Sequence, residues 1–139
     1  MSDKTYTRVK ELMNPAPAVI DGLATVQEAL DVMRRKNVGA LVIDRRHEGD
    51  EYGIVVLSDI ASKIIGEDRA PARTNVYEIM SKPVLTLDGE TDIKYAIRLL
   101  SRFGLARALV TDCGELAGIV TVRAMVFHYI PEDDGGAEA

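Results

Sequence analysis

The stretch VKELM at residues 9–13 returns as VYEIM at residues 76–80, and each copy opens a run of chain that matches the other. An Asp-Gly pair follows each copy, at residues 21–22 and 88–89. Such self-similarity usually means two copies of one supersecondary unit that bury their apolar faces against each other. We therefore expect two related units with a seam between them, and seams of this kind are where small ligands bind.

Two further matches occur later in each copy. ALVID at residues 40–44 corresponds to ALVTD at residues 108–112, and GIV at residues 53–55 returns at residues 118–120. Both are short, dense apolar runs of the kind that form buried strands.

These matches divide the chain into segments. Residues 8–66 form repeat 1 and residues 76–130 form repeat 2, and a linker over residues 67–75 contains Pro71 and several charges. Residues 131–139 are acidic, contain glycine and are poor in apolar side chains. That composition predicts a disordered tail.

The composition favours a globular protein and excludes several other classes. With 47% hydrophobic residues among 139, there is enough apolar material for a core shared by two small halves. A net charge of -5 argues against a nucleic-acid partner. No apolar run approaches the roughly 20 residues of a membrane span, and the first residues do not form a signal peptide, so we expect a cytoplasmic protein. A single cysteine and two histidines predict neither a disulfide nor a metal site.

Local patterns place the elements of repeat 1. Thr25 and Glu28 have the spacing of a capping box, which predicts a helix that ends near Lys36. Residues 39–44 and 52–57 predict two buried strands, and the polar residues between them predict a hairpin.

A second helix is expected after residue 57, with Ser58 and Asp59 as its N-caps. Repeat 2 has the same order of elements: a strand at 84–87, a helix at 92–103, strands at 107–111 and 116–122, and a helix at 124–130. Each repeat is therefore predicted to be strand, helix, strand, strand, helix.

In this order the repeated pieces resemble the cystathionine β-synthase (CBS) domain, present here as a tandem pair. The resemblance rests on Val-x-x-Leu/Ile-Met, on Asp-Gly before a helix, on Ala-Leu-Val-x-Asp and on Gly-Ile-Val before a helix, and it covers residues 9–130. It implies an α+β (mixed α/β) fold of two β-α-β-β-α units packed through their sheets about a pseudo-twofold axis. Such a stand-alone pair is called a Bateman module.

The resemblance also implies a function. Members of the family typically bind AMP, ADP, ATP or S-adenosylmethionine in clefts between the units, and they act as sensors rather than as enzymes. We therefore expect an adenine nucleotide as regulatory ligand, with no required cofactor and no catalytic activity. Because two such pairs commonly form a disc-like dimer, a homodimer and an unknown effector protein are the expected partners.

In the family's binding pattern a glycine begins the second hairpin strand, Ser or Thr follows three residues on, and Asp three residues further. The carboxylate can accept hydrogen bonds from both ribose hydroxyls, while the hydroxyl and the helix N-terminus can donate to phosphate. Repeat 1 has Asp59 at the acidic position but Val56 at the hydroxyl position, with Ser58 as the nearest hydroxyl.

Repeat 2 departs from the pattern in the opposite way. It has the expected Thr121, but Ala124 replaces the aspartate and lies beside Arg123. Before the Ala-Leu-Val strand, where the family often has a basic residue, repeat 2 has Arg107 and repeat 1 has Gly39. An arginine there can reach phosphates as a planar donor.

The resemblance implies that the acid of one repeat and the base of the other converge on one nucleotide. Asp59 and Arg107 are therefore expected to form one competent cleft, and the opposite cleft is expected to lack both anchors. Lys82 and Pro83 lead into a strand that should flank a cleft and are further candidate contacts.

Each candidate also has a simpler interpretation. Asp59 can serve only as a helix N-cap. Arg107 can be a solvated strand-edge residue that pairs with Asp112 or Glu115. Thr121 can be an ordinary β-branched strand residue.

The leading functional hypothesis is a module that binds an adenosine ligand and signals to a partner protein. The alternative is a CBS pair without ligand binding that acts in dimerisation or protein docking, which the departures at Val56 and Ala124 favour. An enzyme would need a nucleophile with a base, paired carboxylates or a metal centre, and no spacing in the sequence suggests one.

Overall fold

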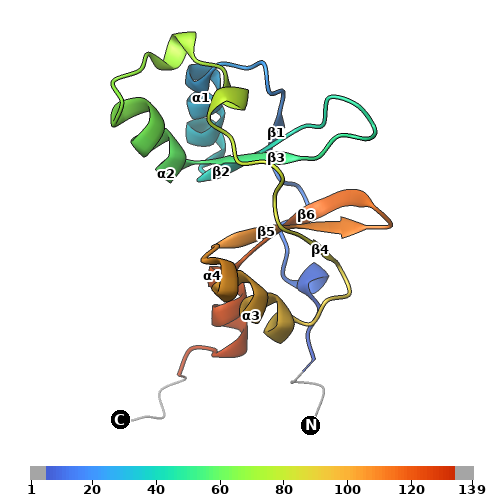
Figure 1. Cartoon of the computed structure of the whole chain (residues 1–139). Coiled ribbons are helices and arrows are strands. Elements are labelled where there is room, and N and C mark those ends of the chain that lie inside the picture. Colours follow the sequence, from blue (N-terminus) through green and yellow to red (C-terminus); the bar gives the residue numbers. More distant parts are fainter. Residues whose placement is uncertain (1–5, 134–139) are drawn as a thin grey trace. The chain divides into compact units, whose positions relative to one another are not determined.

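The computed structural model describes residues 6–133, which divide into two compact units (Figure 1). Unit 2 is Pro17–Val84, and unit 1 combines the residues up to Ala16 with those from Leu85 onward. The opening segment of each sequence repeat therefore packs with the sheet of the other repeat. Val9 of repeat 1 is fully buried in the core of unit 1, and Val76 of repeat 2 is fully buried in the core of unit 2.

Unit 2 contains a three-stranded mixed sheet in the order β1-β2-β3, in which β1 is parallel and β3 antiparallel to β2. Its elements are β1 (Val19–Ile20), α1 (Val26–Lys36), β2 (Ala40–Ile43), β3 (Gly53–Val56), α2 (Leu57–Ile60) with a π-helical continuation (Ala61–Ile65), and 3-10 turns at Pro71–Arg73 and Val76–Glu78.

Unit 1 repeats this plan with sheet order β4-β5-β6, again with one parallel and one antiparallel pairing. Its elements are a 3-10 turn (Val9–Glu11), β4 (Thr86–Asp88), α3 (Ile93–Phe103), β5 (Arg107–Asp112), β6 (Glu115–Thr121) and α4 (Val122–Tyr129). In each unit both helices lie on one face of the sheet (Figure 1). The predicted α+β fold of two β-α-β-β-α units is confirmed. None of the helices between residues 6 and 133 is long and apolar enough to cross a membrane.

Local chemistry accounts for the ends of the two longer helices. The Thr25 hydroxyl accepts a hydrogen bond from the Glu28 N–H at 3.1 Å, and the Glu28 carboxylate accepts one from the Thr25 N–H at 2.8 Å. The predicted capping box is therefore present at the start of α1. At the end of α3, Gly104 adopts φ +65°, a left-handed conformation that glycine adopts at little cost.

Each unit has its own hydrophobic core between its sheet and its helices. The core of unit 2 is built from Val26, Ala29, Met33, Leu41, Ile43, Val55, Ile60, Ile64, Val76 and Ile79. The core of unit 1 is built from Val9, Leu87, Ile93, Ala96, Leu100, Ala108, Val110, Val120 and Met125.

The sheet register corrects one detail of the sequence alignment. Ala40 faces Val56 across β2 and β3, and Arg107 faces Thr121 across β5 and β6. Both Ala40 and Arg107 are half-buried and are followed by three buried strand residues. The counterpart of Arg107 is therefore Ala40 rather than Gly39. The match of Ala-Leu-Val in the two repeats had placed Arg107 opposite Gly39, but strand pairing and burial shift the alignment by one residue.

A second correction concerns the start of α2. The predicted N-caps Ser58 and Asp59 are wrong, because the helix begins at Leu57 and its N-cap position is Val56. Strand β3 runs directly into the helix, and the Leu57 N–H donates to the Gly39 carbonyl at 3.0 Å. In the predicted tail, residues 131–133 are exposed, and the remainder from residue 134 lies outside the described residues.

The glycine that begins the pattern in each repeat has a packing role. A Cβ at Gly53 would lie 2.8 Å from the sulfur of Met80, and one at Gly118 would lie 2.5 Å from the carbonyl oxygen of Asn14. Met80 and Asn14 come from the exchanged opening segments. These glycines allow the segments to approach the hairpin strands closely.

Candidate ligand-binding site

Asp59 is the third residue of α2, at the edge of the sheet where β3 ends. Its side chain is 22% exposed, and one carboxylate oxygen lies 4.0 Å from the ammonium of Lys63. Lys63 in turn donates a hydrogen bond to the Ile79 carbonyl at 3.1 Å. Among residues 6–133 no hydrogen bond to the Asp59 carboxylate is present, so the simpler interpretation as a helix N-cap is wrong.

Two other predicted contacts lie beside Asp59. Val56 is half-buried at the end of β3 and offers no polar atom from its side chain, while Ser58 is exposed on the first turn of α2. The N-cap position of α2 therefore makes no side-chain hydrogen bond. This edge of unit 2 presents one carboxylate and one exposed hydroxyl.

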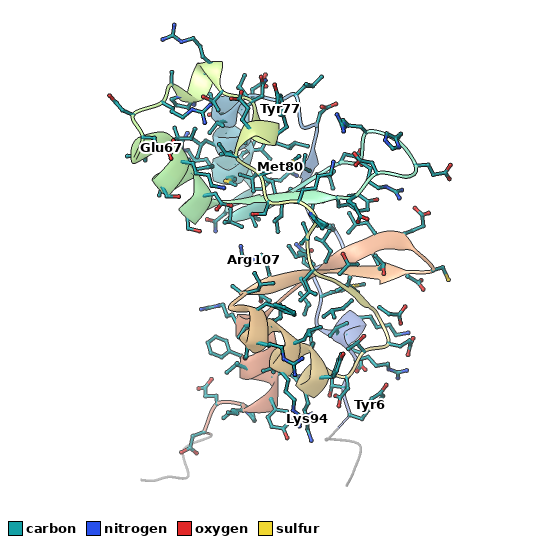
Figure 2. All side chains as sticks on the ribbon, in the orientation of Figure 1. Tyr6, Glu67, Tyr77, Met80, Lys94 and Arg107 are labelled. Carbon is teal, nitrogen blue, oxygen red and sulfur yellow. The ribbon has the colours of Figure 1, made fainter. Side chains whose placement is uncertain are left out.

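Arg107 begins β5 in unit 1 and is labelled in Figure 2. Its Nε atom is buried and has no hydrogen-bond partner within the described part of the chain. The alternative of an ion pair with Asp112 or Glu115 is wrong, because those residues face each other at the turn end of the hairpin and Arg107 lies at its open end. A buried guanidinium nitrogen without a partner is costly, by about 1 to 3 kcal/mol.

The residues that follow β6 form the first turn of α4. The Thr121 hydroxyl accepts a hydrogen bond from the Ala124 N–H at 3.1 Å, so Thr121 is the N-cap of the helix. Arg123 is exposed, and its guanidinium carbon lies 4.8 Å from the centre of the Phe127 ring. Ala124 occupies the place that corresponds to Asp59, so unit 1 has two arginines nearby, Arg107 and Arg123, and no aspartate at that position.

Lys82 and Pro83 lie elsewhere in unit 2. The Lys82 ammonium is 2.8 Å from Asp50, whose side chain is only 10% exposed. The hydrogen bond from Lys82, with one from the Arg46 N–H, holds the pKa of Asp50 well below its usual range. Pro83 follows a cis peptide bond and is exposed.

The structure thus groups the predicted site residues into three places. Asp59, Val56 and Ser58 share one edge of unit 2, and Arg107, Thr121 and Arg123 share one edge of unit 1. Ser81 bridges to Ile54, near the start of β3, so Lys82 lies at the opposite edge of unit 2 from Asp59. The sharing of one ligand between Asp59 and Arg107 stays a prediction.

Sequence reasoning missed a cavity of about 740 Å³ that lies wholly within unit 2. Asp21, Asp44, Arg45, Tyr77 and Lys82 are among its lining residues. Asp21 and Asp44 were visible in the sequence as parts of the repeated Asp-Gly and Ala-Leu-Val-x-Asp motifs, but the parallel pairing of the strands that they follow was not. Among the described residues no group of three His, Cys, Asp or Glu side chains could hold a metal ion.

Comparison with known proteins identifies the family to which this chain belongs. The CBS domain family matches the chain twice, over residues 9–66 and 76–130. The chain therefore belongs to the CBS domain family and carries a tandem pair of these domains.

Solved structures show the same fold. A hexameric CBS-CP12 protein from bloom-forming cyanobacteria is 34% identical, with a TM-score of 0.84 over 88% of this chain and 67% of that chain. The CBS domain pair of protein MJ0100, in complex with 5-methylthioadenosine and S-adenosyl-L-methionine, is 23% identical, with a TM-score of 0.75 over 87% of this chain and 94% of that chain. The second likeness is one of fold alone.

Curated relatives differ in length. A 33.4 kDa protein encoded in a ribosomal RNA operon of Thermofilum pendens is 30% identical over 86% of this chain, which spans 43% of that relative. The CBS domain-containing protein YhcV of Bacillus subtilis is 26% identical over 93% of this chain and 90% of the relative.

Proposed function

We propose that this CBS pair is a non-catalytic regulatory module that binds an adenosine-containing ligand of the AMP, ADP or ATP class beside Asp59 and signals to a partner protein. The observation that carries the proposal is the state of Asp59, a half-buried carboxylate that neither caps its helix nor accepts a hydrogen bond within residues 6–133. Such a group is available to accept hydrogen bonds from the two ribose hydroxyls.

The unpaired guanidinium of Arg107 supports the phosphate part of the proposal. A planar donor whose Nε has no partner within the described chain gains most from an anion. Asp59 of unit 2 is the proposed acceptor for ribose hydroxyls, and Arg107 of unit 1 is the proposed donor to a phosphate. Each hydrogen bond to a charged group contributes about 1.5 to 3 kcal/mol, and a micromolar ligand needs about 8 kcal/mol in total, so these two anchors supply a large share.

The fold adds support at a coarser level. A protein with this fold, MJ0100, has been solved with two adenosine derivatives, 5-methylthioadenosine and S-adenosyl-L-methionine. The proposal extends the ligand class to this chain and leaves the number of phosphates to experiment. It also places the module in the cytoplasm.

A thermal-shift series tests the proposal. AMP, ADP, ATP, NADH and S-adenosylmethionine are added separately at concentrations up to the millimolar range. A ligand at a hundredfold above its dissociation constant stabilises the fold by about 2.7 kcal/mol, which raises the melting temperature by several degrees. No shift with any of the five ligands would contradict the proposal and favour a docking module without ligand.

Dimerisation is a second proposal, and the surface of unit 1 supports it. Large apolar side chains on α3, on α4 and directly after α4 have high exposed fractions: Tyr95 56%, Phe103 59%, Phe127 60%, Tyr129 46% and Ile130 70%. Exposed aromatic side chains are enriched at protein interfaces. We propose a second copy of the chain as the occupant, as in the disc-like dimers expected from the family.

A further inference from the structure

The cavity within unit 2 lies at the carboxyl ends of β1 and β2. Its volume of about 740 Å³ is within the range of small-molecule sites. Asp21 follows β1, Asp44 follows β2, and the Asp44 N–H donates to the Ile20 carbonyl at 2.9 Å. Asp59 instead follows β3, which runs antiparallel to β2, so the cavity is at the other edge of the sheet from the proposed adenosine site.

The corresponding place in unit 1 carries an ion-pair network. Glu90 occupies the position of Leu23, and Lys10 occupies the position of Tyr77. Lys10 and Glu90 form an ion pair, and Arg8 lies 3.1 Å from the other oxygen of Glu90. In unit 2 these charges are replaced by apolar side chains, and Leu23 is 72% exposed and Tyr77 51% exposed at the cavity. Exposed apolar groups around a cavity favour contact with a ligand.

Two carboxylates of the cavity are only partly used by the fold. One oxygen of Asp21 accepts a hydrogen bond from the Leu23 N–H at 2.8 Å, and one oxygen of Asp44 accepts a hydrogen bond from the Arg45 N–H at 2.8 Å. Neither carboxylate has an ion-pair partner among residues 6–133. The second oxygen of each is therefore available to a cationic or hydroxyl donor.

The basic side chains of the cavity differ in their availability. Lys82 and Arg46 share the carboxylate of Asp50, at 2.8 Å and 3.5 Å. The Arg45 guanidinium lies 4.8 Å from the centre of the Tyr52 ring and donates one hydrogen bond, to the Glu48 carbonyl at 3.3 Å. It has no carboxylate partner in the described chain. Arg45 is thus the cation that retains donors for an anionic group.

We propose that this cavity binds a small zwitterion with an apolar side chain, of the α-amino-acid class. The ligand's ammonium pairs with Asp21 and Asp44, its carboxylate pairs with Arg45, and its side chain lies against Leu23 and Tyr77. A ligand with one sign of charge leaves either the two carboxylates or the Arg45 guanidinium without a partner, and it therefore gains fewer charge-assisted hydrogen bonds. The site is independent of the adenosine site, so either proposal can fail without the other.

Calorimetry and amide NMR with L-phenylalanine, L-leucine and L-methionine test the proposal on the full chain. At least one of the three is expected to bind, with amide shifts at residues 21–23 and 44–46 rather than around Asp59. Phenethylamine lacks the carboxylate of L-phenylalanine, and 3-phenylpropionate lacks its ammonium. Each is expected to bind about tenfold more weakly or worse than L-phenylalanine, because one charge pair is lost.

Asp21→Asn has a matched control in the other unit. The Asp88 carboxylate accepts a hydrogen bond from the Glu90 N–H at 3.0 Å, just as Asp21 does from Leu23. Asparagine preserves this turn at both places, so neither variant should unfold. Asp21→Asn is expected to weaken amino-acid binding about tenfold, and Asp88→Asn to leave it unchanged.

A double variant introduces into the cavity of unit 2 the ion pair that Lys10 and Glu90 form in unit 1. Leu23→Glu with Tyr77→Lys is expected to abolish amino-acid binding while the melting temperature and the response to AMP stay near those of the wild type. Binding of none of the three amino acids would overturn the proposal. So would equal binding of the two truncated analogues, or equal effects of Asp21→Asn and Asp88→Asn.

Discussion

Arg107 and Thr121 face each other at the open end of the β5–β6 hairpin. Their polar groups differ in that one is hydrogen-bonded within the unit and the other is not. The Thr121 hydroxyl is used within the fold, where it caps α4 through the Ala124 N–H. The Nε of Arg107 is buried without a partner in residues 6–133. Thr121 thus stabilises the unit. The buried, unpaired Nε of Arg107 destabilises it, and a ligand that accepts a hydrogen bond from this nitrogen can offset that loss.

The cap at Thr121 gives a first prediction. Thr121→Val removes the side-chain hydrogen bond at the start of α4 and should lower the free energy of unfolding by about 1 kcal/mol. Val56→Thr is the reciprocal change, because Val56 is the N-cap of α2 and makes no side-chain hydrogen bond. It should raise stability by up to about 1 kcal/mol. Urea unfolding measures both, and a loss of stability in Val56→Thr would contradict the geometry of the α2 cap.

Arg107 gives a second prediction, in which stability and binding change in opposite directions. Arg107→Leu removes a buried unpaired nitrogen and should raise the melting temperature of the free protein by a few degrees. The same change should weaken binding of AMP at least tenfold, because the phosphate loses its guanidinium donor. Arg98→Leu, on the exposed face of α3, is the control and should alter AMP binding little. Unchanged AMP affinity in Arg107→Leu would remove Arg107 from the site.

The Asp50–Lys82 pair gives a prediction for pH dependence. Hydrogen bonds from Lys82 and from the Arg46 N–H keep the pKa of Asp50 well below its ordinary value of 3.8. The unfolded state therefore binds a proton at Asp50 before the folded state does. The stabilisation is fully present above about pH 4 and is lost progressively as the pH falls below that value.

Urea unfolding between pH 2.5 and 6 checks this behaviour. Asp50→Asn should be less stable than the wild type at pH 6, and the difference should shrink as the pH falls. Glu48→Gln lies in the same loop and serves as a control, since the Glu48 carboxylate forms no ion pair with residues 6–133. A difference between Asp50→Asn and the wild type that grows toward low pH would contradict the assignment.

The apolar surface of α3 and α4 gives a prediction about assembly. Phe127→Glu replaces one of these exposed aromatic side chains, on α4, with a charge and should shift a homodimer to monomer in analytical ultracentrifugation. Ile65→Glu is a matched control, because Ile65 is 76% exposed in unit 2, outside that surface. A wild-type chain that sediments as a monomer at micromolar concentrations would contradict the proposed dimer.

Much of the fold could be predicted because local and repeated signals agree. The capping box at Thr25 and the two hairpins were visible in the sequence, and both are present. The exchange of opening segments was not visible, because VKELM and VYEIM are apolar on the same face and either could pack on either sheet. Only the complete packing assigns Val9 to one core and Val76 to the other.

The candidate site was predicted less completely, and for a physical reason. Ser and Asp before an apolar helical run usually cap it, yet β3 continues directly into α2 and the cap falls at Val56. The cavity at Asp21 and Asp44 depends on parallel pairing between segments well separated in sequence. No local sequence pattern shows such pairing, so these two aspartates were identified only as matching positions of the two repeats.

Calorimetric titration with AMP of the wild type, Asp59→Ala and Ala124→Gly tests the central claim most directly. We predict one site per chain in the wild type, affinity about tenfold to a hundredfold weaker in Asp59→Ala because the ribose loses its acceptor, and little change in Ala124→Gly. Equal effects of the two substitutions, or full affinity in Asp59→Ala, would contradict the claim that Asp59 anchors the ligand.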